Sequence, residues 1–463
     1  MRVPAPCVLL LAALVAGAPR PLGAAGEERE YPLRVVPLEA NPTTQRTDLR
    51  TVRTLGDAIP LGTATFPVLS RERGLRVGVS PDGKRTATVR AGKPVEFRWS
   101  EGEERRTVRL CFEESGEGTW TYAGAEAVEA DVEGTPLRIF DLDLDGRYDG
   151  FGSDGIAAHG GSVALPLERE FPHGRHRVTI LSVDAAKGWI RARVEPLEGN
   201  EAQLAVLAGI NDLRVSHGLP PVGLDPALSR GCCAHARYLR VWGWTGTTDP
   251  HVQDHGPDAV SEEGAAAARR SVIARAPGTV ALDWYWRSWY HRIGLMSPGL
   301  SRVGIDDGRE GISIVDVGQR FDAERDEALQ KAWPWQDPVV VPADGATGVP
   351  LQSSPEMLGE PVPDLGSRGF PVMAVFRYRF LDLGEVTATL EEESRGKWIP
   401  VPFLYPERKK YPYVVGLVPA RPLKPATRYR ARLEIEHFPE IEPPPGVEQV
   451  REVIVRTTTF RTR

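Results

Sequence analysis

The spacing of apolar residues changes twice along the chain, and this change limits the possible folds more than any other feature of the sequence. Up to about residue 198 and again after residue 341, short segments alternate apolar and polar residues, which is the period of a half-buried strand. Between these regions apolar residues recur every three or four positions, as on one face of a helix. A chain of 463 residues with this pattern is expected to form a multidomain protein, with a mixed α/β domain between two β domains.

Alternation in the N-terminal region predicts a β-rich domain over residues 61–198. Val95, Phe97 and Trp99, for example, are separated by Glu96 and Arg98. Gly and Pro are frequent, with 47 and 41 residues, and favour many turns between short strands. Residues 26–60 show no clear period and are expected to be a leader or linker.

The helical pattern predicts a separate central domain over residues 199–325. Leu204, Leu207 and Ile210 begin the first helical stripe, and Asp225-Pro226 offers an N-cap with Pro at the first position of a second helix. A short helical run is expected over 261–274 and a further helix from Thr279. Short strands follow, so the order of elements indicates an α/β or α+β unit.

The last part of the chain predicts a second β domain. Trp333-Pro334-Trp335 marks a linker over residues 326–340. Residues 341–463 then show alternating segments separated by turn residues, which indicates a β-sandwich. This part resembles bacterial Ig-like modules.

The N-terminal sequence predicts export. Arg2 precedes a short apolar run, Val8 to Ala16, and small residues follow up to Ala25, so residues 1–25 are expected to be a signal peptide. No later run is long enough for a transmembrane helix, and the expected location is extracellular, periplasmic or at the cell surface. The net charge of -6 disfavours nucleic acid as a partner.

An acidic motif in the N-terminal region has the spacing of a calcium loop. Asp141, Asp143, Asp145 and Asp149 occupy positions 1, 3, 5 and 9, and Gly146 occupies position 6. Position 12 lacks the usual glutamate, and the flanks are strand-like. The motif therefore predicts either a calcium site or a solvated turn whose Asp side chains cap their own backbone.

Histidines are concentrated in the central domain, which holds five of the nine. His251, Glu263 and His291 could meet in a pocket that binds a divalent metal such as zinc, or that supports acid/base chemistry. The alternative is that these residues are partly buried and connect a loop to helix ends. His235 lies on an apolar helical stripe and is expected to be a core residue.

Several short motifs of the central domain, in this order, resemble one known family. They are Ile210-Asn211-Asp212-Leu213-Arg214, Gly218-Leu219-Pro220-Pro221, Leu224-Asp225-Pro226-Ala227-Leu228, Ala234-His235-Ala236, His251, Glu263-Gly264, Asp283 through Ser288 to His291-Arg292, and Arg302-Val303-Gly304-Ile305. Together they resemble the CAP superfamily (cysteine-rich secretory protein, antigen 5 and pathogenesis-related 1) in its bacterial SCP-like form. The resemblance covers about a quarter of the chain.

The resemblance implies an α/β/α sandwich around a cavity that two His and two Glu line in many members. By position, His251 corresponds to the first histidine, Glu263 to the Glu of the Gly-Glu-Asn motif and His291 to the histidine of the Ser-x-x-His-Arg motif. Gly264 replaces the Asn, and the second Glu, expected near Ser288, is absent.

The resemblance also sets the functional expectation. Such proteins are mostly secreted, so we expect non-catalytic binding of an extracellular ligand, namely a lipid, a cell-wall component or a protein, through the cavity. The alternative is a metal-assisted hydrolase in which His251, Glu263 and His291 hold a metal that activates water. Trp284 and its neighbouring tryptophans are expected to be core residues rather than a ligand platform.

Overall fold

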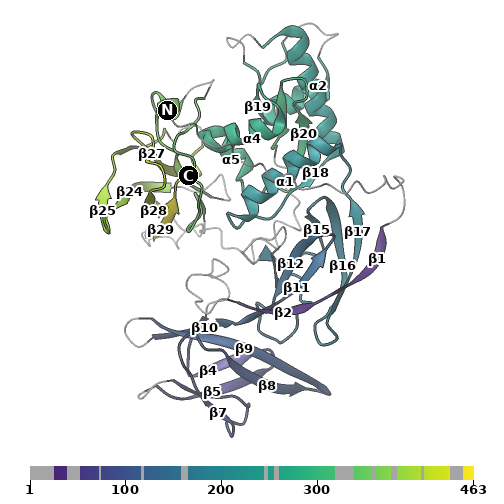
Figure 1. Ribbon diagram of the computed structural model, residues 1–463, viewed down its shortest axis with the longest axis vertical. Coiled ribbons are helices and arrows are strands. Elements are labelled where there is room, and N and C mark those ends of the chain that lie inside the picture. Colours follow the sequence, from purple (N-terminus) through teal and green to yellow (C-terminus); the bar gives the residue numbers. More distant parts are fainter. Residues whose placement is uncertain are drawn as a thin grey trace, which may run out of the picture.

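The computed structural model describes twelve stretches of the chain (Figure 1). These are residues 26–38, 53–71, 75–115, 119–157, 165–244, 249–254, 260–318, 338–356, 360–376, 383–407, 411–437 and 452–463. The expected signal peptide and residues 326–337 of the expected linker lie outside them.

The N-terminal region forms two β units, each with its own core. The first β unit packs two four-stranded antiparallel sheets around aromatic residues such as Phe66 and Phe97, whose ring centroids are 5.2 Å apart. Its sheets are β3 (Arg53–Thr54), β10 (Thr119–Gly124), β9 (Glu104–Ser115) and β8 (Val95–Glu101), and β4 (Ala58–Leu61), β5 (Ala64–Ser70), β6 (Arg76–Gly78) and β7 (Thr86–Thr88).

The second β unit lies between the first β unit and the helical domain (Figure 1). One sheet holds four strands and the other five. They are β1 (Glu27–Pro32), β17 (Trp189–Pro196), β16 (His176–Asp184) and β15 (Glu170–His173), and β14 (Leu165–Pro166), β13 (Gly155–Ala157), β12 (Thr135–Phe140), β11 (Glu126–Val132) and β2 (Arg34–Pro37).

The N-terminal boundaries differ from the sequence-based expectation. Residues 26–38 are not a leader, because β1 pairs with β17 and β2 pairs with β11. The apolar period missed these strands because they lie at sheet edges, where only Tyr31 is buried and backbone hydrogen bonds hold the strand in place. The expected single domain over 61–198 is likewise two units with separate cores.

The central domain is a three-layer α/β/α sandwich. Its sheet has the order β18 (Gly223–Leu224), β20 (Arg302–Asp307), β21 (Ser313–Asp316) and β19 (Ser271–Ala274). One core joins α1 (Glu201–Val215) and α4 (Gly278–Arg287) to one face of the sheet, and another joins α2 (Pro226–Trp242) and α3 (Glu262–Arg270) to the other face. The short helix α5 (Trp289–Leu295) follows α4 directly.

Local sequence explains where these helices begin and end. Asn200 and Gln203 form a reciprocal capping box on α1, and Asp225 caps α2 with Pro226 at its first position, as predicted. The helical run expected over 261–274 is wrong in its last four residues. Helix α3 ends at Arg270, and the buried residues 271–274, with two β-branched side chains, pair with β21 instead.

One glycine sets the distance between α2 and the sheet. A Cβ atom added to Gly304 on β20 would lie 2.4 Å from the backbone carbonyl carbon of Leu228 on α2. Only a residue without a side chain therefore allows the helix to pack this closely, while the neighbours Val303 and Ile305 point into the opposite core.

The C-terminal sandwich, residues 338–463, consists of two antiparallel sheets around one core. They are β22 (Val339–Val341), β23 (Val372–Val375), β27 (Val414–Pro419) and β26 (Phe403–Leu404), and β25 (Lys397–Pro400), β24 (Leu383–Ser394), β28 (Arg428–His437) and β29 (Glu452–Arg461). A single 3-10 turn, η2 (Leu365–Ser367), precedes β23.

The central domain and the C-terminal sandwich share a hydrophobic core, and they lie side by side in Figure 1. Trp289 and Ile293 of α5 belong to the same buried cluster as the strands of the sandwich. The fully buried Arg292 guanidinium lies 4.0 Å from the centroid of the Phe370 ring and donates to the Pro371 carbonyl oxygen over 2.8 Å. This packing fixes one domain against the other. No helix in the described part of the chain is long and apolar enough to cross a membrane.

Candidate ligand pocket and acidic loop

A pocket of about 800 Å³ lies where the central domain meets the C-terminal sandwich. The central domain provides most of the wall from the loop after α2, from α3 and β19, and from α4 and α5. The sandwich provides the remainder. The lining residues are Trp244, Asp249, Pro250, His251, Arg269, Arg270, Ser271, Val272, Ile273, Trp284, Tyr290, His291, Ile293, Gly294, Ser297, Val317, Gly318, Glu356, Tyr411 and Tyr413.

His291 is held firmly at the wall of this pocket. Its ring stacks on the buried Tyr285 ring at a centroid distance of 5.5 Å and contacts the Trp284 ring at 5.1 Å. Its Nδ1 atom lies 2.6 Å from the Ser288 hydroxyl oxygen and 3.0 Å from Oε2 of Glu356. The imidazole is therefore oriented by aromatic contacts on its faces and by hydrogen bonds at one nitrogen.

Glu356 is a site residue that the sequence did not reveal. It follows Ser288 by 68 positions and belongs to the C-terminal sandwich, yet its side chain is only 3% exposed and reaches the start of α5. Its Oε1 atom accepts hydrogen bonds from the Ser288 hydroxyl and from the Tyr290 backbone N–H. This glutamate thus places a carboxylate beside Ser288, near the position where the family's second Glu is expected.

The surroundings of Glu356 keep its carboxyl group ionised. Burial raises its pKa, but hydrogen bonds from His291, Ser288 and the Tyr290 N–H, together with the charge on His291, outweigh burial and hold the pKa below its usual value. A carboxylate at this place accepts hydrogen bonds and cannot donate one.

Of the other two residues predicted for the cavity, one lines the pocket and one lies outside it. His251 lines the pocket, and its Nδ1 atom lies 2.8 Å from the Ala268 carbonyl oxygen. Glu263 is exposed on α3 and is not part of the pocket wall. Within the described residues, no three His, Cys, Asp or Glu side chains of the pocket lie close enough together to hold a metal.

The predicted core residues are divided between core and pocket. His235 is fully buried and bonded at both ring nitrogens, to the Pro250 carbonyl oxygen and the Gln253 amide, and burial lowers its pKa to about 4. Trp289 is a core residue as expected. Trp284 packs against the core of the central domain and also lines the pocket.

Aromatic rings from both domains form much of the remaining wall. Tyr290 of α5 and Tyr411 of the sandwich lie 5.5 Å apart between ring centroids, and Tyr411 contacts Tyr413 at 6.0 Å. Arg270, also in the wall, pairs with the buried Asp316 over 2.6 Å, and Arg269 is exposed. The pocket therefore combines flat apolar surfaces with imidazole, carboxylate and guanidinium groups.

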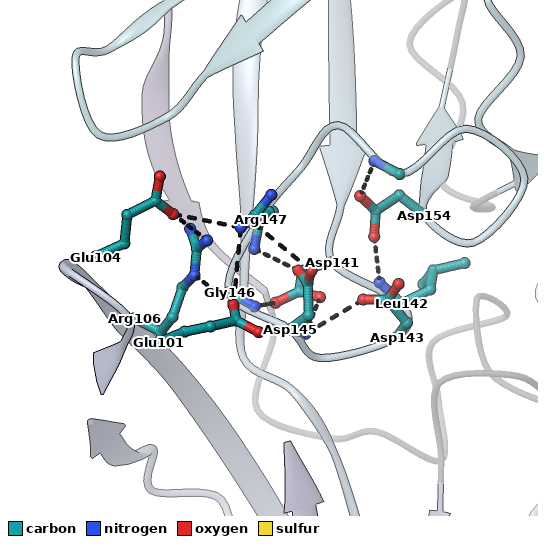
Figure 2. Close-up of polar contacts among 11 residues, drawn as sticks. Glu101, Glu104, Arg106, Asp141, Leu142, Asp143, Asp145, Gly146, Arg147 and Asp154 are labelled. Atoms are coloured by element: carbon teal, nitrogen blue, oxygen red, sulfur yellow. Dashed lines mark hydrogen bonds and ion pairs between the residues drawn. The ribbon is translucent and has the colours of Figure 1, made fainter. Parts of the chain in front are cut away.

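The second candidate site is the acidic loop, residues 141–154, which connects β12 to β13 (Figure 2). Asp141, Asp143 and Asp145 each offer a carboxylate oxygen within 4.8 Å of the other two. Asp141 accepts the backbone N–H groups of Asp145 and Gly146 over 3.0 and 2.9 Å. The loop thus closes as a turn around three converging carboxylates.

Three carboxyl groups of the acidic loop, those of Asp141, Asp145 and Asp154, have raised pKa values, and burial is the main cause in each case. Burial, with added repulsion from Asp143 and Asp145, raises the pKa of Asp141 to about 7. Burial and the nearby Asp141 and Asp143 raise the pKa of Asp154 to about 8. Asp154 lies outside the spacing that marked this motif, whereas Asp149, which was part of that spacing, is not in the cluster of three.

The acidic loop also connects the two N-terminal β units. Leu144 has a left-handed backbone, with φ of 63°, and its side chain is buried in the core of the first β unit. Arg53 of β3 donates to the carbonyl oxygens of Leu142 and Asp143 over 3.0 and 3.2 Å. The shape of the loop therefore affects the contact between the units.

Comparison with known proteins identifies the class of the central domain. Residues 207–311 match the model of the CAP family, described as the cysteine-rich secretory protein family. This match agrees with the motifs in the sequence and with the three-layer fold, so the chain carries a CAP domain with β domains on both sides. No curated protein and no solved structure matches the chain.

Proposed function

We propose that this is an exported, non-catalytic binding protein that holds an extracellular ligand in the pocket between its CAP domain and its C-terminal sandwich. The observation that carries the proposal is the pocket itself. At about 800 Å³ it lies in the size range of small-molecule sites, and it has aromatic walls with a few converging polar groups. We further propose that the C-terminal sandwich is an Ig-like module.

The polar groups of the pocket favour an amphipathic ligand over a purely apolar one. The polar edge of the His291 ring would lose contact with water beneath an apolar molecule, and a buried polar group left without a partner costs about 1–3 kcal/mol. Tyr290 and Tyr411 in turn offer apolar faces. Among the expected ligand classes, a cell-wall fragment or a lipid with a polar headgroup fits better than a protein, which needs a broader surface.

The alternative of a metal-assisted hydrolase receives less support from the geometry. It requires His251, Glu263 and His291 to share one ion, but Glu263 is exposed on α3 outside the pocket wall. A catalytic zinc site usually has three protein ligands and an open position. The residues found at the pocket do not fit that set.

Ligand-observed NMR on the purified mature protein tests the proposal. The probes are soluble peptidoglycan fragments and dihexanoylphosphatidylcholine, and the variants are Tyr411→Ala in the pocket and Tyr405→Ala, an exposed tyrosine outside it. We expect one probe class to bind, with affinity reduced at least tenfold by Tyr411→Ala and unchanged by Tyr405→Ala. Absence of binding by both classes, or equal binding by both variants, would contradict the proposal.

For the acidic loop we propose a structural calcium site. Three carboxylates within 4.8 Å of one another match the hard oxygen ligands that calcium prefers. Calorimetry with calcium should give a one-site isotherm that Asp143→Asn abolishes and that Asp131→Asn, at an exposed position near the end of β11, leaves intact. A wild-type protein without a binding signal would leave the alternative, a turn that caps its own backbone.

A further inference from the structure

The hydrogen bonds around His291 determine which of its ring nitrogens carries the proton. Nδ1 faces two oxygens, Ser288 Oγ at 2.6 Å and Glu356 Oε2 at 3.0 Å. The Ser288 hydroxyl donates its proton to Oε1 of Glu356, so toward the ring it can only accept. The carboxylate of Glu356 has no proton to give.

Both neighbours of Nδ1 are therefore acceptors, and Nδ1 must be the donor. A lone pair at Nδ1 would face the oxygen lone pairs at hydrogen-bonding distance, which is repulsive. In a neutral imidazole only one nitrogen is protonated, so Nε2 then carries a lone pair. The stacked Tyr285 ring and the Trp284 ring hold this arrangement in place.

Nε2 is the nitrogen of His291 that Glu356 does not contact, and the His291 ring lines the pocket. The His291 side chain is 14% exposed, and the pocket is the cavity that it borders. The CAP domain supplies the imidazole, whereas the C-terminal sandwich supplies the carboxylate that orients it. The C-terminal sandwich therefore contributes to the hydrogen-bonding chemistry of the pocket as well as to its walls.

We infer that Glu356 is a positioning residue that fixes the neutral form of His291 in the Nδ1–H tautomer, so that the neutral ring gives the pocket a hydrogen-bond acceptor at Nε2. The matching ligand presents a hydroxyl or N–H donor to that nitrogen. This ligand class rests on the proposed function, but the tautomer is a property of the free protein and can be measured without a ligand.

Nitrogen NMR of the full mature chain tests the assignment. Protonated and unprotonated ring nitrogens resonate far apart, and His291→Gln identifies the signals of His291. At alkaline pH, where imidazole is neutral, we expect the wild-type His291 ring to be protonated at Nδ1. A wild-type ring protonated at Nε2 would overturn the inference at once.

Variants of the carboxylate show whether Glu356 is the cause. Glu356→Ala should shift His291 toward the Nε2–H form, which free histidine prefers in water. Glu356→Gln places its amide oxygen against the Tyr290 N–H and its NH2 group against Nδ1, so it should also shift His291 toward the Nε2–H form. Glu360→Gln is the matched control, because Glu360 accepts from the Leu365 N–H instead. An unchanged tautomer in a folded Glu356→Ala protein would show that Glu356 does not position the ring.

The outcome is separable from that of the binding experiment. An Nδ1–H ring in a protein that binds neither probe class would uphold the positioning role and contradict the proposed function. A ligand that binds beside an Nε2–H ring would do the reverse.

Discussion

Replacement of Glu356 by alanine should destabilise the junction between the CAP domain and the C-terminal sandwich. The change removes the acceptor for three donors, namely Ser288 Oγ–H, the Tyr290 N–H at 2.7 Å and the His291 Nδ1–H at 3.0 Å. A buried donor left without its acceptor costs about 1–3 kcal/mol, so the loss of this shared acceptor should cost about 3 kcal/mol or more. Because Glu356→Gln retains the shape of the side chain and one acceptor oxygen, its cost should be smaller, about 1–2 kcal/mol.

The loss of stability caused by Glu356→Ala should also depend on pH, and the lowered pKa of Glu356 determines in which direction. A carboxyl group with a lowered folded pKa stabilises the protein fully above its unfolded value, about 4.3. The contribution disappears as pH falls through the folded value, because the native state must then take up a proton that it disfavours. The difference between wild type and Glu356→Ala should therefore be large at pH 7 and small in acid.

Urea unfolding followed by tryptophan fluorescence measures this difference. The chain has several domains, so the transition of the CAP domain and C-terminal sandwich must be analysed separately from that of the N-terminal units. A loss below about 1 kcal/mol at pH 7 would be no larger than the contribution of an ordinary solvent-exposed ion pair, and would contradict the role of Glu356 at the junction. So would a loss of the same size at pH 7 and pH 3.

Three further results are expected. Gly304→Ala should destabilise the CAP domain by about 1–3 kcal/mol, because the added Cβ atom would overlap Leu228. Gly223→Ala is the control and should be nearly neutral, because no atom lies within 4 Å of its added Cβ atom; thermal unfolding compares the two variants. Phe370→Ala removes a ring from the core shared by the CAP domain and the C-terminal sandwich and should lower the free energy of unfolding by about 3–5 kcal/mol. Hydrogen exchange should show that both domains lose stability. Since the pKa of Asp141 is raised to about 7, calcium must displace a proton from this carboxyl group. Calorimetry should therefore show that calcium affinity rises as pH increases from 6 to 8, and a pH-independent affinity would contradict this.

The central domain was predictable because its signals are local. Asp225-Pro226 marks the start of α2 through the physics of the helix terminus, and the short motifs around it carry the family resemblance. His251 and His291 could be assigned to one cavity from that resemblance, and both line the pocket. Glu263 could not be excluded in advance, because its exposure depends on how α3 is oriented.

The residues that the sequence did not reveal depend on contacts between distant segments. Glu356 has no helical or strand period around it, and its role arises only when the C-terminal sandwich docks on α5. Asp154 joins the acidic loop through a fold-back that its spacing does not indicate. Strands β1 and β2 were missed for a related reason, since edge strands are held by backbone pairing and need little apolar alternation.

The CAP domain and the C-terminal sandwich build one pocket between them, and a double-mutant cycle across that pocket is the decisive measurement. Tyr290 of α5 and Tyr411 of the sandwich both line the pocket, with ring centroids 5.5 Å apart. We expect Tyr290→Ala and Tyr411→Ala to be coupled by about 0.5–1.5 kcal/mol in unfolding free energy, as for other aromatic pairs in contact. Tyr290→Ala and Tyr405→Ala should be additive. Coupling of zero between Tyr290 and Tyr411 would mean that the two walls do not meet in solution and that the two domains do not share one pocket.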